Sequence, residues 1–220
     1  MKSTLPTFPR CLLDSRLGER HHSLDDFRAA QPYGQSVRES TEYSVVVVTE
    51  TLPEMEIQAS TTKESKGPKS KRSSSEHNTR ILLGMRNRGP DRGFYTPFGG
   101  RFLDERESPE ASACRELEKA TTLKINRDEM GKSKVGVQRF TFENEPVEMI
   151  MHVFRIKLEK LSAKVDSQSV KGCDEVTPVW YNDLNTIPFD KMFADNSLWL
   201  IALLKSSIPL KINGSYHFKD

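Results

Sequence analysis

The middle of the chain combines glycines, carboxylates and basic side chains in a pattern typical of phosphate chemistry. Two glycines are followed by Glu107 and then by the consecutive pair Arg115 and Glu116. Carboxylates that share one helical face, at positions i, i+3 and i+4, can hold Mg²⁺, and a bound metal neutralises a polyphosphate and activates water. Here Lys119 and Ala120 occupy the positions that would complete such a face with Glu116. The pattern therefore indicates a phosphate site but argues against efficient hydrolysis.

The lysine at position 119 also changes the charge of this helical face. A lysine can bind phosphate directly, as a point charge and without a metal. Glu118 cannot join Glu116 on this face, because residues two positions apart on a helix point about 200° apart. Phosphate binding can thus persist where metal-dependent cleavage is weakened.

Loops, strands and helices that would position these residues can be read from the pattern of apolar residues. The glycine-rich loop covers residues 84–100, and the helix after it begins with Ser108 as N-cap and Pro109 at its first position. A run of valines within residues 42–50 predicts a strand buried on both faces. The remaining predicted elements are strands over 80–85, 135–142, 147–158, 176–181 and 211–218 and a helix over 195–206 with Asp195 as N-cap.

Two segments lie outside this pattern. Residues 1–41 lack a sustained apolar period and are predicted to be a disordered tail. The remaining residues, 42–220, form one domain, interrupted at about 51–79 by a disordered insertion rich in serine and lysine. Its basic residues could form a nuclear address or a weak phosphate-binding patch, but a solvated loop is the better interpretation.

The whole-chain totals exclude several classes of protein. A net charge of +2, from 33 basic and 31 acidic residues, predicts no strong binding to nucleic acid. The 3 cysteines have no CxxC spacing, which argues against a zinc site and suits reduced thiols. The lack of a long apolar span predicts no membrane segment. A cytoplasmic location is expected, with a nuclear one as the alternative.

The same central segment resembles the signature of the Nudix hydrolases, Gly-x5-Glu-x7-Arg-Glu-U-x-Glu-Glu-x-Gly-U, where U is aliphatic. The matching residues are Gly100, Glu107, Arg115, Glu116 and Leu117. Further segments extend the resemblance to the oxidised-purine nucleoside triphosphate diphosphatases of that family; they are 80–85, 98–100, 149–154, 174–180 and 187–199. The resemblance implies an α/β fold, the Nudix α/β/α sandwich with a mixed β-sheet. The loop departs from the signature, since six residues instead of five precede the first glutamate.

The resemblance also assigns roles at the phosphate site. It implies that Glu116, Arg115, Glu107 and Glu175 are the catalytic residues, with Arg115 paired to Glu107 to brace the loop. An ordinary surface ion pair is the alternative for that arginine. The implied metal ligands are the carbonyl of Gly99 and the carboxylates of Glu116 and Glu175, which could hold one Mg²⁺ weakly.

For the nucleotide itself, the resemblance places a purine between aromatic side chains and polar groups that read its edge. The implied substrate-binding residues are Arg86, Thr96, Lys119, Phe140, Phe142, Met149, Phe193, Asp195 and Asn196. Two departures change the hydrogen-bonding pattern: Asn196 stands where the family has an aspartate, and Thr96 where it has an asparagine. Phe140, Phe142 and Met149 suit a pocket and a plain core equally well.

Two functions follow from these observations. One is Mg²⁺-dependent hydrolysis of 8-oxo-dGTP-like nucleotides to monophosphate and pyrophosphate, at reduced activity. The other is a catalytically impaired Nudix domain that binds a nucleotide or a protein partner. The predicted partner is a small-molecule nucleotide, and an unidentified protein partner is the alternative for the second function. The loss of two metal ligands is expected to cost several powers of ten in rate.

Overall fold

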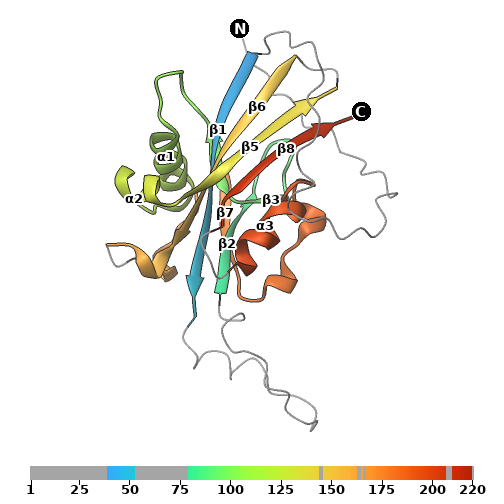
Figure 1. The fold of residues 1–220 in the computed structure, drawn as a ribbon. Helices are drawn as coiled ribbons and strands as arrows, with labels where there is room; N and C mark the ends of the chain where they lie inside the picture. The colour runs from blue at the N-terminus through green and yellow to red at the C-terminus, as the bar shows by residue number, and fades with distance from the viewer. Residues whose placement is uncertain are drawn as a thin grey trace.

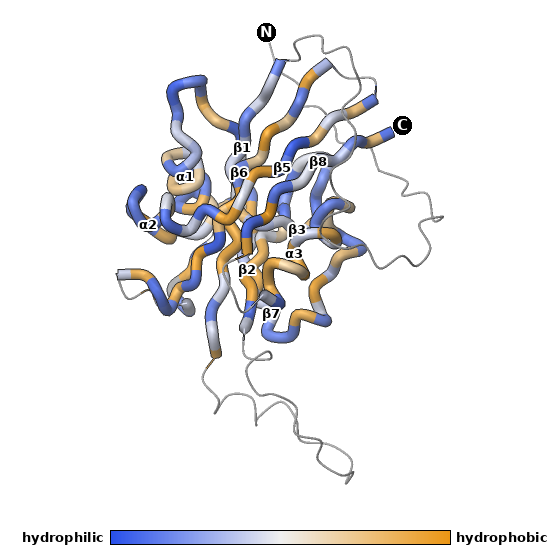
Figure 2. Tube along the Cα trace, viewed as in Figure 1, coloured by the Kyte–Doolittle hydropathy of each residue, from blue (hydrophilic) through white to orange (hydrophobic). Residues whose placement is uncertain are grey.

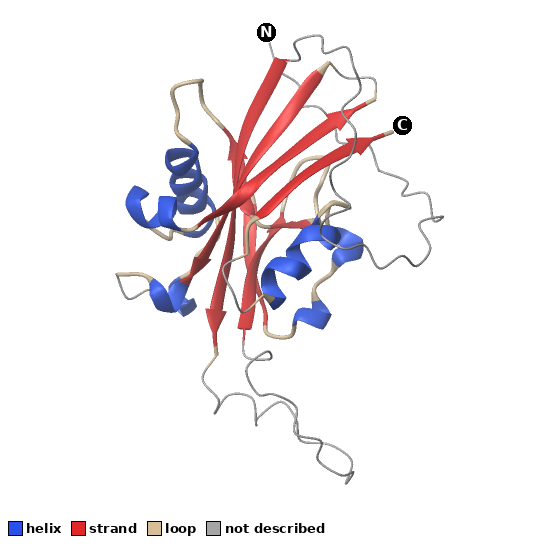
Figure 3. Cartoon of the chain, viewed as in Figure 1, coloured by secondary structure: helices blue, strands red, loops and turns tan. Residues whose placement is uncertain are grey.

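The computed structural model describes residues 39–52, 79–143, 146–162, 165, 167–206 and 210–219. In these ranges a twisted sheet lies between helices that cover both of its faces (Figures 1 and 3). The predicted α/β sandwich with a mixed sheet is therefore confirmed. Most of the predicted tail and most of the predicted insertion lie outside the described residues, but residues 39–41 of the predicted tail form the start of the first strand.

The sheet has eight strands, and β1 lies in its middle, where it pairs with β2, β4 and β6. Its strands are β1 (Glu39–Thr51), β2 (Thr79–Arg86), β3 (Tyr95–Thr96), β4 (Phe98–Arg101), β5 (Lys134–Phe142), β6 (Val147–Lys157), β7 (Val176–Tyr181) and β8 (Ile212–Phe218). Their order is β3-β2-β1-β6-β5-β8, with β4 paired to β1 and β7 to β2. The β1–β6 and β5–β8 pairs are parallel and the other pairs are antiparallel.

The valine run of β1 is buried on both faces, as its composition predicts. Val46 and Val48 pack in a cluster with residues of α1 (Pro109–Thr121) and α2 (Arg127–Lys132). Val47 packs in a second cluster with residues of α3 (Asn196–Lys205). Figure 2 shows hydrophobic residues concentrated where the strands pass between these helices. Side chains alternate across a strand, so β1 contributes to the core of both layers.

Helix α1 begins as its sequence predicts. The Ser108 side chain accepts a hydrogen bond from the backbone N–H of Ala111, and Pro109 occupies the first turn. The helix ends at Thr121, and Thr122 then adopts a left-handed conformation with φ of 63°. Since Thr122 stands where the Nudix signature has glycine, a β-branched residue here occupies a conformation that glycine adopts at less cost.

Two local features differ from the sequence-based expectation. The short helix α2 was not predicted, because six residues carry too little apolar periodicity to be recognised. Asp195 does precede α3, but its side chain makes no capping hydrogen bond. Its carboxylate instead accepts a hydrogen bond from the indole N–H of Trp199. Four short 3₁₀ helices complete the described elements; they are Leu158–Lys160, Ser167–Ser169, Leu184–Thr186 and Phe189–Lys191.

A buried hydroxyl pair joins α1 to the central strand. Ser112 Oγ lies 2.9 Å from Ser44 Oγ, and both residues are fully buried. We expect Ser112→Ala to lower the free energy of unfolding by about 1–2 kcal/mol, because it leaves the Ser44 hydroxyl without this partner. The Ser44→Ala, Ser112→Ala double variant should recover most of that loss, since removing both hydroxyls leaves no unsatisfied group. Urea denaturation of the three variants measures the interaction free energy between the two hydroxyls. A double variant that loses as much free energy of unfolding as the two single variants together would contradict this expectation.

Candidate phosphate and nucleotide site

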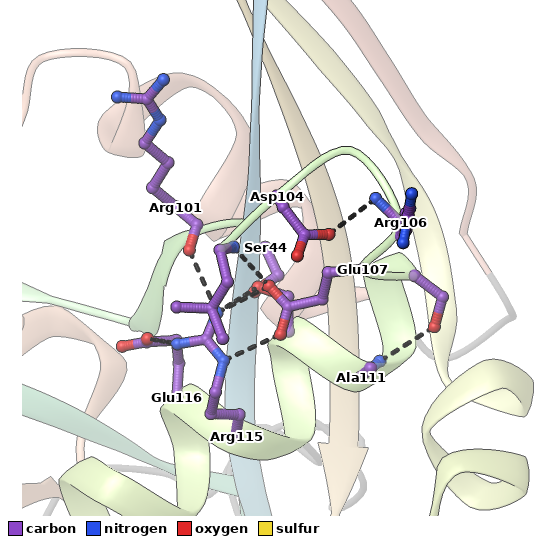
Figure 4. A network of polar contacts seen from close by, with 11 residues as sticks. Ser44, Arg101, Asp104, Arg106, Glu107, Ala111, Arg115 and Glu116 are labelled. Atoms are coloured by element: carbon purple, nitrogen blue, oxygen red, sulfur yellow. Dashed lines mark hydrogen bonds and ion pairs between the residues drawn. The ribbon is translucent and has the colours of Figure 1, made fainter.

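An ion pair between Arg115 and Glu107 closes the loop that leads into α1 (Figure 4). Arg115 Nε lies 2.8 Å from Glu107 Oε1, and Arg115 Nη2 lies 2.8 Å from Glu107 Oε2. The backbone N–H of Leu103 donates to the same carboxylate at 2.7 Å. The hydrogen bond from Arg115 holds the pKa of Glu107 below its ordinary value. With only 10% of the Glu107 side chain exposed, this bidentate pair is more than a solvated surface contact.

Arg115 also connects the loop to strand β4 and to the next helical residue. Its Nη2 donates to the backbone carbonyl of Arg101 at 3.1 Å, and its Nη1 contacts the carboxylate of Glu116 (Figure 4). The guanidinium thus holds two carboxylates and one carbonyl at once, which its planar set of donors permits. The structure therefore brings together three of the four predicted catalytic residues.

Two consecutive glycines allow this arrangement by letting the elements approach closely. A Cβ on Gly99 would collide with the backbone carbonyl of Ser44 in the neighbouring strand. A Cβ on Gly100 would lie 2.6 Å from the Cδ atom of Glu116. The carboxylate of Glu116 therefore lies directly over the β4 backbone, where a larger residue would displace it.

Lys119 lies where the signature would place a second carboxylate, and it forms an ion pair across the site. Its Nζ is 3.1 Å from Glu175 Oε2, in the turn before β7. The hydrogen bond with Glu175 is the largest cause of a raised Lys119 pKa, and the charge of Glu116 adds to it. The pKa of Glu175 is lowered, first by the hydrogen bond from Lys119. The ammonium group thus attracts both carboxylates that the family resemblance assigns to a metal.

These contacts do not fit a divalent metal ion as they stand. Glu116 is engaged by Arg115, and Glu175 is engaged by Lys119. Within the described ranges, no three histidine, cysteine, aspartate or glutamate side chains form a group that could hold a metal. Glu118 does not fill the gap, because it pairs with Lys124 at 3.2 Å, away from the site. In this arrangement the ammonium group of Lys119 lies near both carboxylates.

Further basic residues surround the Glu175 turn. Arg86 contributes to the lowered pKa of Glu175, and Arg88 lies 3.6 Å from Asp174 in an exposed ion pair. The backbone N–H of Asn87 donates to the Glu175 carbonyl at 2.9 Å, which ties the turn to the end of β2. The predicted phosphate-binding residues Arg86 and Lys119 therefore lie near the same acidic side chain.

Three of the residues predicted to bind the base lie around the start of α3. Asp195 Oδ2 accepts a hydrogen bond from Trp199 Nε1 at 3.0 Å, and burial raises the Asp195 pKa above its ordinary value. The Asn196 amide donates to the carbonyl of Phe193 at 3.2 Å. Phe193 packs against Phe94, with ring centroids 6.1 Å apart. Three of the predicted base-binding residues are thus grouped at one helix N-terminus.

The aromatic residues of β5 stack on those of the adjacent strand β8. Phe140 lies 5.1 Å from Tyr216 and Phe142 lies 5.4 Å from Phe218, between ring centroids. Met149 of β6 is the cross-strand partner of Phe140. Phe140 and Phe142 are buried. The sequence analysis did not single out Tyr216 and Phe218, although their spacing of two residues is the signal of one sheet face.

Thr96 lies apart from these aromatic residues, in the short strand β3. It pairs with Gly84 of β2, whereas the adjacent Tyr95 pairs with Met85 and packs against the cluster that contains α3. Tyr95 makes an edge contact with Tyr181 at 5.8 Å. No helix in the described part of the chain is long and apolar enough to cross a membrane.

Comparison with known proteins identifies similar sequences and similar solved structures. No protein-family model matches the chain. The oxidized purine nucleoside triphosphate hydrolase of Mus musculus is 33% identical over 141 residues, which cover 64% of this chain and 80% of the relative. The Danio rerio protein of the same name is 32% identical over 126 residues, covering 57% and 72%. Similar solved structures include a NUDIX hydrolase from Nitrosomonas europaea, with 12% identity, a TM-score of 0.45 and coverage of 79% and 78%.

An α/β/α sandwich with a glycine loop, a bracing arginine and a glutamate on its first helix defines a protein of the Nudix class. With two relatives of this identity and coverage, the chain belongs to the Nudix hydrolase family. It is similar to the oxidized purine nucleoside triphosphate hydrolases within that family.

Proposed function

We propose that this Nudix domain binds a purine nucleoside triphosphate through a phosphate site in which Lys119 replaces metal ions, and that its hydrolytic activity is strongly impaired. The ion pair between Lys119 and Glu175 carries this proposal. A lysine there supplies positive charge to a phosphate chain, but it cannot activate water as a bound metal does. The names of the relatives suggest an oxidised purine as the base.

The exposed position of this ion pair makes exchange for a ligand feasible. The side chains of Lys119 and Glu175 are 57% and 51% exposed, so the pair is hydrated and contributes little to stability. A phosphate group carries more charge than one carboxylate and accepts several hydrogen bonds. Phosphate can therefore displace Glu175 from Lys119, with Arg86 close enough to share the negative charge.

The experiment is titration calorimetry with 8-oxo-dGTP, dGTP and dATP, in EDTA and again in Mg²⁺. Binding is expected to survive EDTA and to weaken about tenfold in Lys119→Ala, the usual size of one charge-assisted hydrogen bond. Lys124→Ala is a matched control, because Lys124 also pairs with a glutamate near the same helix. It should leave the affinity unchanged.

Pyrophosphate release, measured in parallel, tests hydrolysis, the first of the two functions predicted from the sequence. Hydrolysis of 8-oxo-dGTP in Mg²⁺, together with loss of binding in EDTA, would show a metal-dependent diphosphatase and contradict the proposal. If nucleotide binding in EDTA is unchanged in Lys119→Ala, the proposed role of Lys119 is wrong, but the proposal of metal-independent binding is not.

A further inference from the structure

Gln138 is a fully buried polar residue whose side chain has no hydrogen-bond partner among the residues that the structure describes. It lies in β5 with 0% of its surface exposed, and neither its Nε2 nor its Oε1 is bonded within the described structure. Leaving a buried polar group without a partner costs about 1–3 kcal/mol. Such a group in a folded protein needs an explanation, and a bound ligand is one.

The strand register places Gln138 on the face of the sheet that α3 covers. Its cross-strand partners are Met151 of β6 and Gly214 of β8. Paired residues of neighbouring strands share a face, and Met151 packs against the cluster that contains α3. Gln138 therefore lies on the same face as Phe140, the next residue but one in the strand.

The neighbours of Gln138 are aromatic and polar. Gly214 has no side chain, and the ring of Tyr216 lies over it, with Cε2 and the hydroxyl oxygen 2.9 and 3.0 Å from the position that a Cβ would take. Burial raises the pKa of Tyr216 to about 12, and the negative charge of Asp195 adds to the effect, so the two side chains are close. The register and these contacts gather an amide, a phenol and a carboxylate on one face.

We propose that the Gln138 amide is a specificity-determining group that hydrogen-bonds the edge of the bound purine. The proposal rests on the nucleotide-binding function above and extends its base recognition beyond Asp195 and Asn196. An amide donates and accepts at once, which matches the paired donor and acceptor positions of a purine edge. The rings of Phe140 and Tyr216 supply the flat surface on which a base stacks. The Tyr216 ring occupies the space over Gly214, so it must move aside for the base to reach the amide.

A buried glutamine retained only for packing is a poor alternative. Methionine or leucine would fill a similar volume without a polar group to desolvate, and apolar replacements at buried polar sites are often neutral or stabilising. The amide at position 138 therefore lowers stability unless a ligand or a buried water satisfies it.

The test compares Gln138→Met with the wild-type chain by thermal unfolding and by calorimetry in EDTA. The ligands are 8-oxo-dGTP, dGTP, the nucleoside 8-oxo-deoxyguanosine and inorganic tripolyphosphate. We expect an unchanged or higher melting temperature, unchanged affinity for tripolyphosphate, and about tenfold weaker binding of the ligands that carry a purine. Thr141→Val is the control, because its hydroxyl lies 3.0 Å from His217 Nδ1 and thus already has a partner.

The outcomes separate this inference from the proposed function. Purine affinities within twofold of wild type in Gln138→Met would overturn the inference, and a lower melting temperature with unchanged binding would assign the amide to a buried water. If the wild-type chain binds the nucleoside but not tripolyphosphate, the proposed phosphate site is wrong. The role of Gln138 is then decided by the nucleoside affinity of Gln138→Met relative to wild type. A chain that binds none of the four ligands would overturn both.

Discussion

Restoring two carboxylates on α1 is expected to give the domain metal-dependent hydrolysis. In the Lys119→Glu, Ala120→Glu double variant, pyrophosphate release from 8-oxo-dGTP in Mg²⁺ should rise by at least about a hundredfold. Each restored ligand supplies a few kcal/mol of transition-state stabilisation, and about 1.4 kcal/mol changes a rate tenfold. The new carboxylates at i+3 and i+4 share the face of Glu116. Removing Lys119 also frees Glu175 from its ion pair.

The single variants show which change matters. Lys119→Glu alone should recover part of the activity, because it both removes the ammonium and adds a ligand. Ala120→Glu alone should recover little, since Lys119 would then pair with the new carboxylate as it pairs with Glu175. Ala120 packs against the core cluster of α1, so the melting temperature of each variant must be measured as well. Wild-type turnover equal to that of a folded double variant would show that the missing carboxylates do not limit the reaction.

The overall fold could be predicted because its signals are local or periodic. The valines of β1 are apolar on successive positions, which only burial on both faces explains, and the structure places them in two separate clusters. Ser108 and Pro109 mark the start of α1 with one hydrogen bond and one fixed dihedral angle. Such features require no knowledge of distant residues. The sandwich with a mixed sheet came from the family resemblance and not from these patterns, and the strand order was not predicted.

The contacts at the site could be predicted only where the family resemblance supplied the pairing. The pair of Arg115 and Glu107 followed from it, and the structure shows it. The ion pair between Lys119 and Glu175 joins residues far apart in the sequence, and neither side chain alone indicates its partner. The unbonded amide of Gln138 was also missed, because a lone glutamine in a strand reads as an exposed residue. Asp195 was assigned as a capping group from its position, but Trp199, one helical turn later, takes its carboxylate.

Loss of the Arg115 side chain is expected to destabilise the domain strongly. Arg115→Ala should lower the free energy of unfolding by about 3 kcal/mol, because it leaves the largely buried carboxylate of Glu107 without its cation. For a domain of this size the melting temperature should fall by about 6–12 °C. Arg115→Lys should recover only part of the loss, since an ammonium group cannot make the two parallel hydrogen bonds of a guanidinium. Lys124→Ala removes an exposed pair at 3.2 Å and should cost no more than about 0.5 kcal/mol.

The pH dependence of stability provides an independent check of this pair. The hydrogen bond from Arg115 holds the pKa of Glu107 below its ordinary value in the folded state. The stabilisation from Glu107 is therefore fully present above that value and is lost as the pH falls from it through the folded-state pKa. Arg115→Ala removes the main cause of the shift, so urea denaturation should show a shallower loss of stability over this acidic range. If the free energy of unfolding of Arg115→Ala stays within about 0.5 kcal/mol of the wild-type value and its acid dependence is unchanged, the pair is an ordinary surface ion pair. Other contacts would then have to hold the loop before α1 in place.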